Sequence, residues 1–270
     1  MNMQLTAVGT SGSFPGPGNP ASSYVLRADP SAAPIVVDMG QGALGDLQTH
    51  TDLSTIEAVL LSHLHPDHFI DLTGMYVARS YDPRFFCEGG RPLCALPVYG
   101  PAGTEDRLLA AHHTDPGASP VAENAQDANL DRVFEFHDLH DGAHLRVGGL
   151  EVEATLVDHP VEAYAMRFTD AAGRVMTYSG DTDYCEGIVA AARGADLFLC
   201  EAAFQEGRDT VRGIHLSGRR AGIVAREAGV GKLALTHIPP WTDPEVVAAE
   251  AAAEFSGPLE VARPGRRWDI

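Results

Sequence analysis

The residues with the clearest chemistry lie in one short stretch, His63-Leu64-His65-Pro66-Asp67-His68. Its three imidazoles and one carboxylate are the nitrogen and oxygen ligands that divalent metals bind. A catalytic metal takes about three protein ligands plus water, so four ligand groups in one loop suggest two metals. The competing interpretation is a solvated polar loop, which leaves the clustering of three histidines without a purpose.

Three further candidate ligands each follow an apolar stretch later in the chain. They are His159, Asp181 and His237, and glycine or proline lies within two residues of each of them. Taken singly, each is more simply a loop residue. In this order after the histidine cluster, they predict a metal site built on the loops at one edge of a sheet.

Strands and helices must position these side chains. Alternating or β-branched stretches predict strands at 4–8, 24–28, 34–38, 56–62, 96–99, 132–136, 144–147, 150–157, 163–169, 174–178, 196–200, 232–235 and, last in the chain, 259–262. Helical spacing and capping residues predict helices at 43–50, 67–81, 105–112 after Thr104, 184–193, from Ser217 to Gly229, and from Asp243 to about 255. If the strand at 56–62 extends through them, His63 and His65 project the same way.

The order of these elements predicts the fold class. Strands followed by a helix, twice over, favour two mixed sheets packed face to face with helices outside, a four-layer αββα arrangement, over a doubly wound parallel sheet. No short repeat or linker divides the chain, so we expect a single domain over residues 1–270. The segment 114–129, with few large apolar residues, is expected to be a loop or lid.

Composition narrows the classes of function. The chain has 270 residues with 19 basic and 37 acidic ones, a net charge of −18, which disfavours a nucleic-acid partner and suits a small substrate. None of the four cysteines, Cys87, Cys94, Cys185 and Cys200, forms a CxxC pair, so we expect buried reduced thiols. No apolar run approaches the roughly 18 residues of a membrane span, and the start lacks a basic leader. A cytoplasmic protein is therefore expected.

With these motifs in view, the chain resembles the metallo-β-lactamase-fold hydrolases. His63, His65, Asp67 and His68 match the family's HxHxDH motif, and the later candidates match its other ligand motifs in the same order. The resemblance implies an αββα sandwich and two divalent metal ions, with zinc the first choice and manganese or iron as alternatives.

The same resemblance implies a role for each residue. One metal would take His63, His65 and His159; the second would take Asp67, His68 and His237; Asp181 would bridge them, with a hydroxide between the metals as nucleophile. Asp38 matches an early aspartate of the family that supports the ligand loop without binding metal.

Within this fold, the loop Gly9-Thr10-Ser11-Gly12-Ser13 and the residues Glu201 and His215 resemble the tRNase Z branch. The branch's histidine contacts the scissile phosphate and protonates the leaving oxygen, while its glutamate orients the histidine. A structural ion pair is the competing interpretation of these two residues. We assign catalytic roles to His215, Glu201 and Asp67.

One difference from the tRNase Z branch narrows the range of expected substrates. Its enzymes insert a tRNA-gripping arm between the motifs that match His159 and Asp181, where this chain has little more than a hairpin. The overall run, including residues 63–81 and 235–243, looks most like an actinobacterial subgroup of this fold. That subgroup is linked to cyclic-nucleotide phosphodiesterases. We therefore expect a dinuclear metal phosphodiesterase acting on a cyclic nucleotide, such as 3′,5′-cyclic AMP, or another small phosphodiester. The alternatives are a thioesterase or lactonase of the same fold, a tRNase Z-like RNA 3′-end endonuclease, and a metal-binding scaffold without activity. Dimeric relatives imply a homodimer.

Overall fold

In the described part of the chain, the strands form two seven-stranded sheets. The computed structural model describes residues 2–87, 93–112 and 130–270, so the expected loop at 114–129 lies outside the described residues. The first sheet has the order β14-β1-β2-β3-β4-β5-β6 and the second the order β13-β12-β11-β10-β9-β8-β7. The strands are β1 (Gln4–Gly9), β2 (Ser23–Arg27), β3 (Ile35–Val37), β4 (Ala58–Leu60), β5 (Leu96–Gly100), β6 (Phe134–Asp138), β7 (Ala143–Val147), β8 (Leu150–Leu156), β9 (Tyr164–Thr169), β10 (Val175–Tyr178), β11 (Leu197–Glu201), β12 (Leu233–Thr236), β13 (Leu259–Val261) and β14 (Arg267–Asp269).

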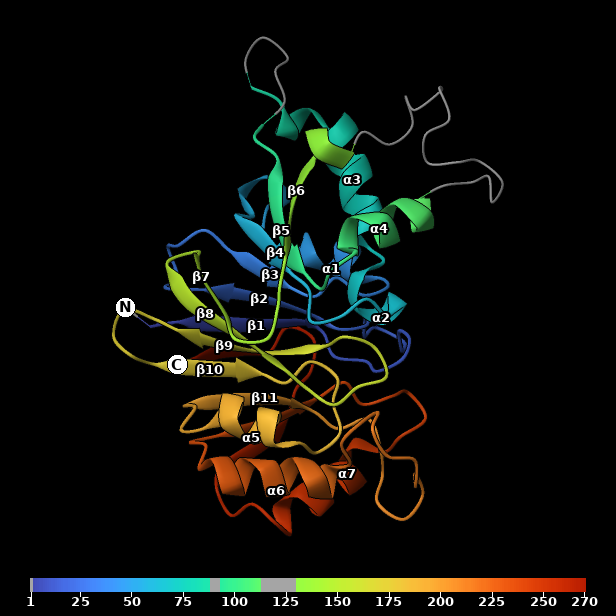
Figure 1. The fold of residues 1–270 in the computed structure, drawn as a ribbon, viewed down its shortest axis with the longest axis vertical. Helices are drawn as coiled ribbons and strands as arrows, with labels where there is room; N and C mark the ends of the chain where they lie inside the picture. The colour runs from blue at the N-terminus through green and yellow to red at the C-terminus, as the bar shows by residue number, and fades with distance from the viewer. Residues whose placement is uncertain (1, 88–92, 113–129) are drawn as a thin grey trace.

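Helices cover the outer face of each sheet, which confirms the predicted sandwich. Figure 1 shows α3 and α4 on one side of the paired sheets and α5, α6 and α7 on the other. The helices are α1 (Ala43–Leu47), α2 (Pro66–Phe69), α3 (Leu72–Tyr81), α4 (Thr104–His112), α5 (Glu186–Ala192), α6 (Gly218–Ala228) and α7 (Pro244–Ala252), with 3-10 turns η1 (Leu53–Thr55), η2 (Pro83–Phe85) and η3 (Leu130–Arg132). Among the described residues, no helix is long and apolar enough to cross a bilayer.

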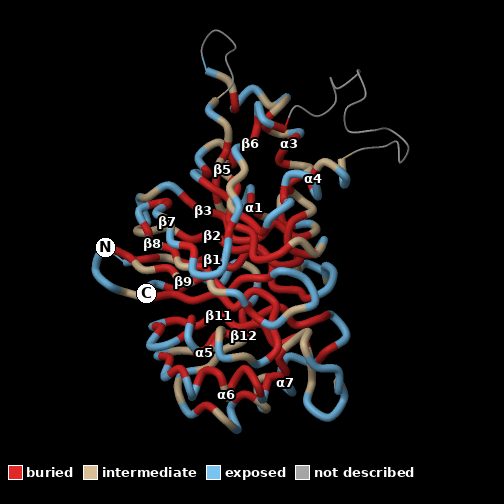
Figure 2. Tube along the Cα trace, viewed as in Figure 1, coloured by how far each residue is buried: buried red, intermediate tan, exposed pale blue. Residues whose placement is uncertain are grey.

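Burial on both faces of the sheets divides the core into three layers. In β11, Leu197 and Leu199 join the cluster between the sheets, whereas Phe198 and Cys200 join the cluster under α5, α6 and α7. This alternation follows from the two-residue period of a strand, and it explains why β11 is apolar on every side chain but the last. A third cluster lies between the first sheet and its helices. Figure 2 shows the buried residues running along both sheets.

Two predicted elements differ from the structure for reasons of tertiary contact. The helix predicted over 67–81 is broken between α2 and α3. At the break, the Asp71 carboxylate accepts a hydrogen bond from Leu44 N at 2.8 Å and Asp71 N donates to Met39 O at 3.0 Å. These contacts with residues in and beside α1 interrupt the helix at Asp71. Thr104 is the first residue of α4, and its hydroxyl donates to Pro101 O at 2.6 Å instead of capping the helix.

Other corrections concern the chain end and the thiols. The strand at 259–262 is not the last one, because β14 follows it and pairs antiparallel with β1, placing Leu5 opposite Trp268. Among the four free cysteines, Cys200 is buried and Cys185 half-buried, but Cys87 and Cys94 are exposed, so the expectation of four buried thiols is wrong. By contrast, Ser217 and Asp243 cap α6 and α7 as predicted.

Candidate metal centre

Strand direction explains why the candidate ligands meet. β10, β11 and β12 are mutually parallel, and β8 runs the same way because β9 is antiparallel to both of its neighbours. Their carboxyl ends therefore lie at one edge of the second sheet, where they present His159, Asp181, Glu201 and His237. The HxHxDH loop approaches this edge from the end of β4 in the first sheet.

The loop after β4 is not an extension of the strand. β4 ends at Leu60, two residues before the predicted boundary, so His63 and His65 lie in the loop that leads to α2. Their convergence therefore comes from the loop conformation and not from strand alternation. His65 is the residue that precedes α2, with an extended backbone, and Pro66 begins the helix.

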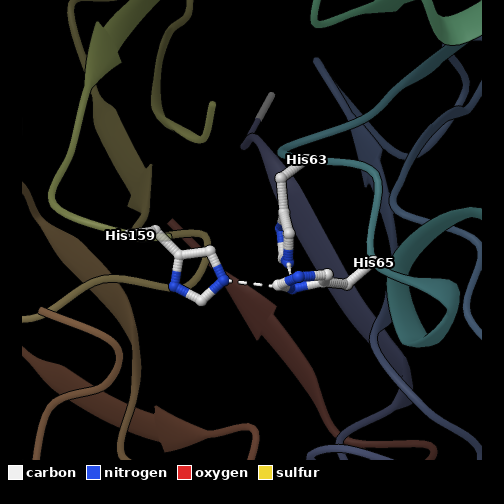
Figure 3. A group of neighbouring side chains, drawn as sticks. All are labelled: His63, His65 and His159. Atoms are coloured by element: carbon white, nitrogen blue, oxygen red, sulfur yellow. Dashed lines mark hydrogen bonds between the residues drawn. The ribbon is translucent and has the colours of Figure 1, made fainter. Parts of the chain in front are cut away.

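Three imidazoles form the first group of candidate ligands. His65 Nδ1 lies 3.1 Å from His63 Nε2 and 3.1 Å from His159 Nε2. Figure 3 shows the three rings turned toward one another, His159 from one side and the other two from the HxHxDH loop. The other ring nitrogen of His159, Nδ1, donates to Ile214 O at 2.8 Å, so its Nε2 carries the lone pair that faces the group.

A second group surrounds the Asp181 carboxylate. Asp181 Oδ2 lies 3.2 Å from both His68 Nε2 and His237 Nε2, and 3.6 Å from His63 Nε2. Asp67 Oδ2 lies 3.7 Å from the same two nitrogens of His68 and His237. The ligand atoms of each group lie within 4.8 Å of one another. Asp181 belongs to the second group and, through its distance to His63, also adjoins the first.

The buried polar atoms of the second group fit a cation. His68 Nε2, His237 Nε2 and Asp181 Oδ1 are buried, and none has a hydrogen-bond partner within the described part of the chain. Leaving such atoms without partners costs about 1–3 kcal/mol each, which a divalent cation would offset. The donor set of histidine nitrogens and carboxylate oxygens suits zinc and also manganese or iron.

The protonation states agree with this interpretation. Burial and the neighbouring His68 push the pKa of His63 well below its ordinary value, so its imidazole is neutral, the form that binds metals. Burial alone would raise the pKa of Asp181, but His237, His68 and His63 hold it well below its usual range. Burial opposes the charged form of His68, yet Asp181 and Asp38 raise its pKa well above the ordinary value. A cation binding at His68 must therefore displace a proton.

Residues behind the candidate ligands fix their orientation. Asp38 accepts hydrogen bonds from Ser62 N at 2.7 Å, His68 Nδ1 at 2.8 Å and the Tyr178 hydroxyl at 2.8 Å. Asp38 therefore supports the ligand loop, in agreement with the sequence expectation. Ser22 and Tyr178 were not singled out from the sequence: Ser22 Oγ lies 2.9 Å from His237 Nδ1. A lone hydroxyl carries no motif, so only the fold reveals these two.

Glu201 and His215 form a pair beside the second group. His215 Nδ1 lies 2.9 Å from Glu201 Oε1 and 3.9 Å from Asp181 Oδ2. Glu201 is fully buried and accepts from Thr182 N at 2.9 Å and Ala203 N at 3.0 Å. Burial opposes protonation of His215, but the Glu201 carboxylate raises its pKa to about 9. The ring is therefore an imidazolium at neutral pH, able to donate a proton.

Comparisons with known proteins agree with this fold and site. The family model described as "Beta-lactamase superfamily domain" matches residues 34–238. A Mycobacterium tuberculosis protein, Rv1339, is 44% identical over 259 residues, 96% of this chain and 89% of its own length. Ribonuclease Z of Mycobacterium bovis is 30% identical over 284 residues, covering 99% of this chain and 98% of the relative.

A solved structure has the same fold as this chain. YhfI of Bacillus subtilis, described as a metallo-beta-lactamase fold protein, is 28% identical over 267 residues, 99% of this chain and 100% of its own. Its crystal structure superposes with a TM-score of 0.82 over 100% of both chains. The chain therefore belongs to the beta-lactamase superfamily. Its fold is that of a metallo-hydrolase, and its His/Asp cluster suggests a divalent metal site.

Proposed function

We propose that this metallo-hydrolase is a phosphodiesterase acting on a cyclic nucleotide, such as 3′,5′-cyclic AMP, or on another small phosphodiester. The observation that carries the proposal is the position of His215, whose Nδ1 lies 2.9 Å from buried Glu201 Oε1 and 3.9 Å from Asp181 Oδ2, beside the metal-ligand cluster. Hydrolysis of a sugar phosphodiester expels a poor alkoxide leaving group, which needs a proton donor. A thioester makes a weaker demand for such a donor, because a thiolate leaves without protonation.

We also propose a division of the ligands between two cations. His63, His65 and His159 hold one, Asp67, His68 and His237 hold the second, and Asp181 lies between them, in keeping with the two groups of converging atoms. When bound, two divalent cations acidify a water molecule and neutralise phosphate charge. Asp38 holds His68 in place, and the Ile214 carbonyl orients His159 through its Nδ1.

His215 supplies the proton in this proposal. Because Nδ1 is engaged by Glu201, Nε2 is the nitrogen that transfers a proton to the leaving sugar oxygen. Glu201, held by the two backbone N–H groups of Thr182 and Ala203, keeps the ring in position. Since the pKa of His215 is about 9, activity that depends on this proton falls as the pH rises through about 9.

The test is hydrolysis of 3′,5′-cyclic AMP by protein loaded with zinc or manganese, followed by chromatography. His65→Ala removes a proposed ligand and serves as the blank. His215→Ala is expected to lower turnover by roughly 100-fold or more while the metal content stays unchanged. His144→Ala, at an exposed position of β7, is the matched control. Full turnover by the His215 variant contradicts its role as the acid, and wild type that cleaves no phosphodiester contradicts the proposed function.

RNA 3′-end processing is a second candidate, favoured by the 30% identity to ribonuclease Z. The connection from His159 to Asp181 consists of the β9–β10 hairpin and short turns, and the net charge of −18 disfavours a polyanion. Cleavage of a tRNA precursor by the metal-loaded protein, at moderate salt, separates this candidate from the first.

A further inference from the structure

Asp183 is a buried carboxylate with an unusual number of donors. Its side chain is 1% exposed and lies two residues after Asp181. Oδ2 accepts from Arg212 Nε at 2.6 Å and Gly213 N at 2.8 Å, while Oδ1 accepts from Tyr184 N at 2.7 Å and from the Arg220 guanidinium. A buried carboxylate requires such partners, but the partners do not explain why a carboxylate is buried so close to the candidate metal ligands.

The backbone around Asp183 joins two segments of the site. Asp183 N donates to Asp158 O at 2.8 Å, and Asp158 N donates to Thr182 Oγ1 at 3.2 Å. Asp158 immediately precedes His159, and Thr182 immediately follows Asp181. The segments that carry one candidate ligand from each metal group are therefore hydrogen-bonded to each other at Asp183.

The side chain of Asp183 adds a third segment, the one that carries His215. Gly213 has a positive φ of 74°, which suits glycine and lets its N–H face the carboxylate. The next residue, Ile214, supplies the carbonyl that holds His159 Nδ1 at 2.8 Å, and His215 then reaches Glu201. A displacement of this segment therefore moves a metal ligand and the proton donor together.

Arg220 anchors the far end of the same segment. Its side chain is 10% exposed, and its Nε donates to Ser217 Oγ at 3.2 Å. Ser217 is the N-cap of α6 and also accepts from Arg220 N at 3.3 Å. Through Arg220, the Asp183 carboxylate fixes where α6 begins, while Gly213 fixes the start of the segment. His215 lies between these two anchors.

We propose that Asp183 is a positioning residue that sets the orientation of His159 and the location of His215 at once. Metal affinity at the three-histidine group and proton donation by His215 then depend on one carboxylate that belongs to none of the candidate ligand groups in the described residues. The part concerning His215 rests on the proposed function. The part concerning His159 rests on its proposed place among the metal ligands and on the hydrogen bonds of Gly213 N and the Ile214 carbonyl.

The test compares Asp183→Asn with a matched variant, Asp170→Asn. Asp170 is also buried, and it accepts from Arg174 Nε at 2.7 Å and from Ala172 N at 2.8 Å. It lies in the turn between β9 and β10, at the ends of those strands away from the metal ligands. Both variants thus remove the charge of a buried carboxylate paired with an arginine, but only one adjoins the site.

Zinc affinity is the first readout, measured by competition with a chromophoric chelator. Asp183→Asn is expected to weaken zinc binding by about 10-fold, because a ligand whose orienting partner moves typically loses 10- to 100-fold. Asp170→Asn is expected to bind zinc as the wild type does. His65→Ala, which removes one of the three histidines, serves as the reference for how far zinc affinity falls when this group is damaged directly.

Dependence on the leaving group is the second readout, at saturating zinc. Asp183→Asn is expected to lower turnover of 3′,5′-cyclic AMP by about 10-fold or more, since its alkoxide needs the proton of His215. Turnover of bis(4-nitrophenyl) phosphate, whose nitrophenolate leaves without protonation, is expected to change by less than about twofold. General loss of structure would lower both rates equally.

Equal zinc affinity in the two Asn variants, with equal losses on both substrates, overturns the proposal. If the wild type cleaves neither phosphodiester, the proposed function fails, and the zinc titration still decides the role of Asp183 toward His159. If Asp183→Asn does not fold, Arg212→Gln replaces it, because that side chain is 64% exposed. Unchanged zinc affinity and unchanged leaving-group dependence in Arg212→Gln then overturn the proposal.

Discussion

At the scale of single residues, the site depends on side chains that bind no metal. Asp38 shows this best: it is fully buried and has a φ of 58°, a left-handed conformation that few side chains other than Asn and Asp adopt readily. This backbone turns its carboxylate toward Ser62, His68 and Tyr178. One residue therefore links the ligand loop of the first sheet to β10 of the second.

Asp38→Asn is the sharpest test at this scale. Asn tolerates the left-handed backbone, so the change removes the negative charge that faces His68 with little added strain. We expect divalent-metal affinity to fall by about 10- to 100-fold, measured by chelator competition. Asp106→Asn, at an exposed position of α4, is the control and should bind as the wild type does. Wild-type affinity in Asp38→Asn would mean that the carboxylate serves only folding.

At the scale of elements, the helices under the second sheet meet through glycine. A Cβ at Gly222 of α6 would lie 2.5 Å from Ala251 O of α7, and one at Gly218 would lie 2.1 Å from Val247 O. The absence of side chains at these two positions allows the two helix backbones to approach closely. This contact fixes the position of the first turn of α6. Ser217 and Arg220, which anchor the C-terminal end of the His215 segment, lie in or beside that turn.

Gly222→Ala therefore tests the packing of these helices. The added methyl group meets backbone, which cannot rotate away, so we expect the free energy of unfolding to fall by about 1–3 kcal/mol. Gly45→Ala in α1 is the matched control, because nothing lies within 4 Å of its Cβ position. There the gain in helix propensity should raise stability by up to about 1 kcal/mol. Urea unfolding measures both; equal midpoints would show that α6 and α7 separate without cost.

At the scale of the whole molecule, the two sheets share one pattern. From β14 to β3 and from β7 to β10, neighbouring strands are antiparallel; from β3 to β6 and from β10 to β13, they are parallel.

Glu260 of β13 links the two sheets near the C-terminal end of the chain. It accepts from Arg266 Nε at 2.8 Å and from Trp268 Nε1 of β14 at 2.7 Å, and it pairs with Lys232.

This link makes stability depend on pH. Burial alone would raise the pKa of Glu260, but Arg266, Lys232 and Trp268 lower it to about 2 from 4.5. Because the folded pKa is depressed, the stabilisation is complete above about pH 4.5 and is lost as the pH falls toward 2. We expect Glu260→Gln to lower the free energy of unfolding at pH 7 by about 1 kcal/mol, after allowing for partial exposure.

Urea unfolding between pH 7 and pH 3 checks this expectation. The difference between wild type and Glu260→Gln should shrink as the pH falls below 4.5. Glu151→Gln is the control, since Glu151 pairs with Arg146 while both side chains are more than half exposed. A difference that stays constant down to pH 3 would show that packing, and not the carboxylate charge, accounts for the effect.

Features that short-range interactions control can be predicted from the amino-acid sequence. The HxHxDH cluster, the caps Ser217 and Asp243, and the alternation that predicts single strands all depend on neighbours within a few residues, and the order of the elements then predicts two mixed sheets. The candidate ligands were recognisable because each follows a strand, and the carboxyl ends of parallel strands must meet at one edge.

Features that depend on partners distant in the sequence become visible only in the folded chain. β14 pairs with β1 from the opposite end of the chain, and the break between α2 and α3 is held by contacts of Asp71 with Leu44 and Met39. Asp183 lies only two residues after the candidate ligand Asp181, yet nothing in the local sequence distinguishes it from a surface carboxylate. Its role appears only when folding places Gly213 and Arg220 against it, because a hydrogen bond requires partners within about 3 Å whatever their separation in sequence.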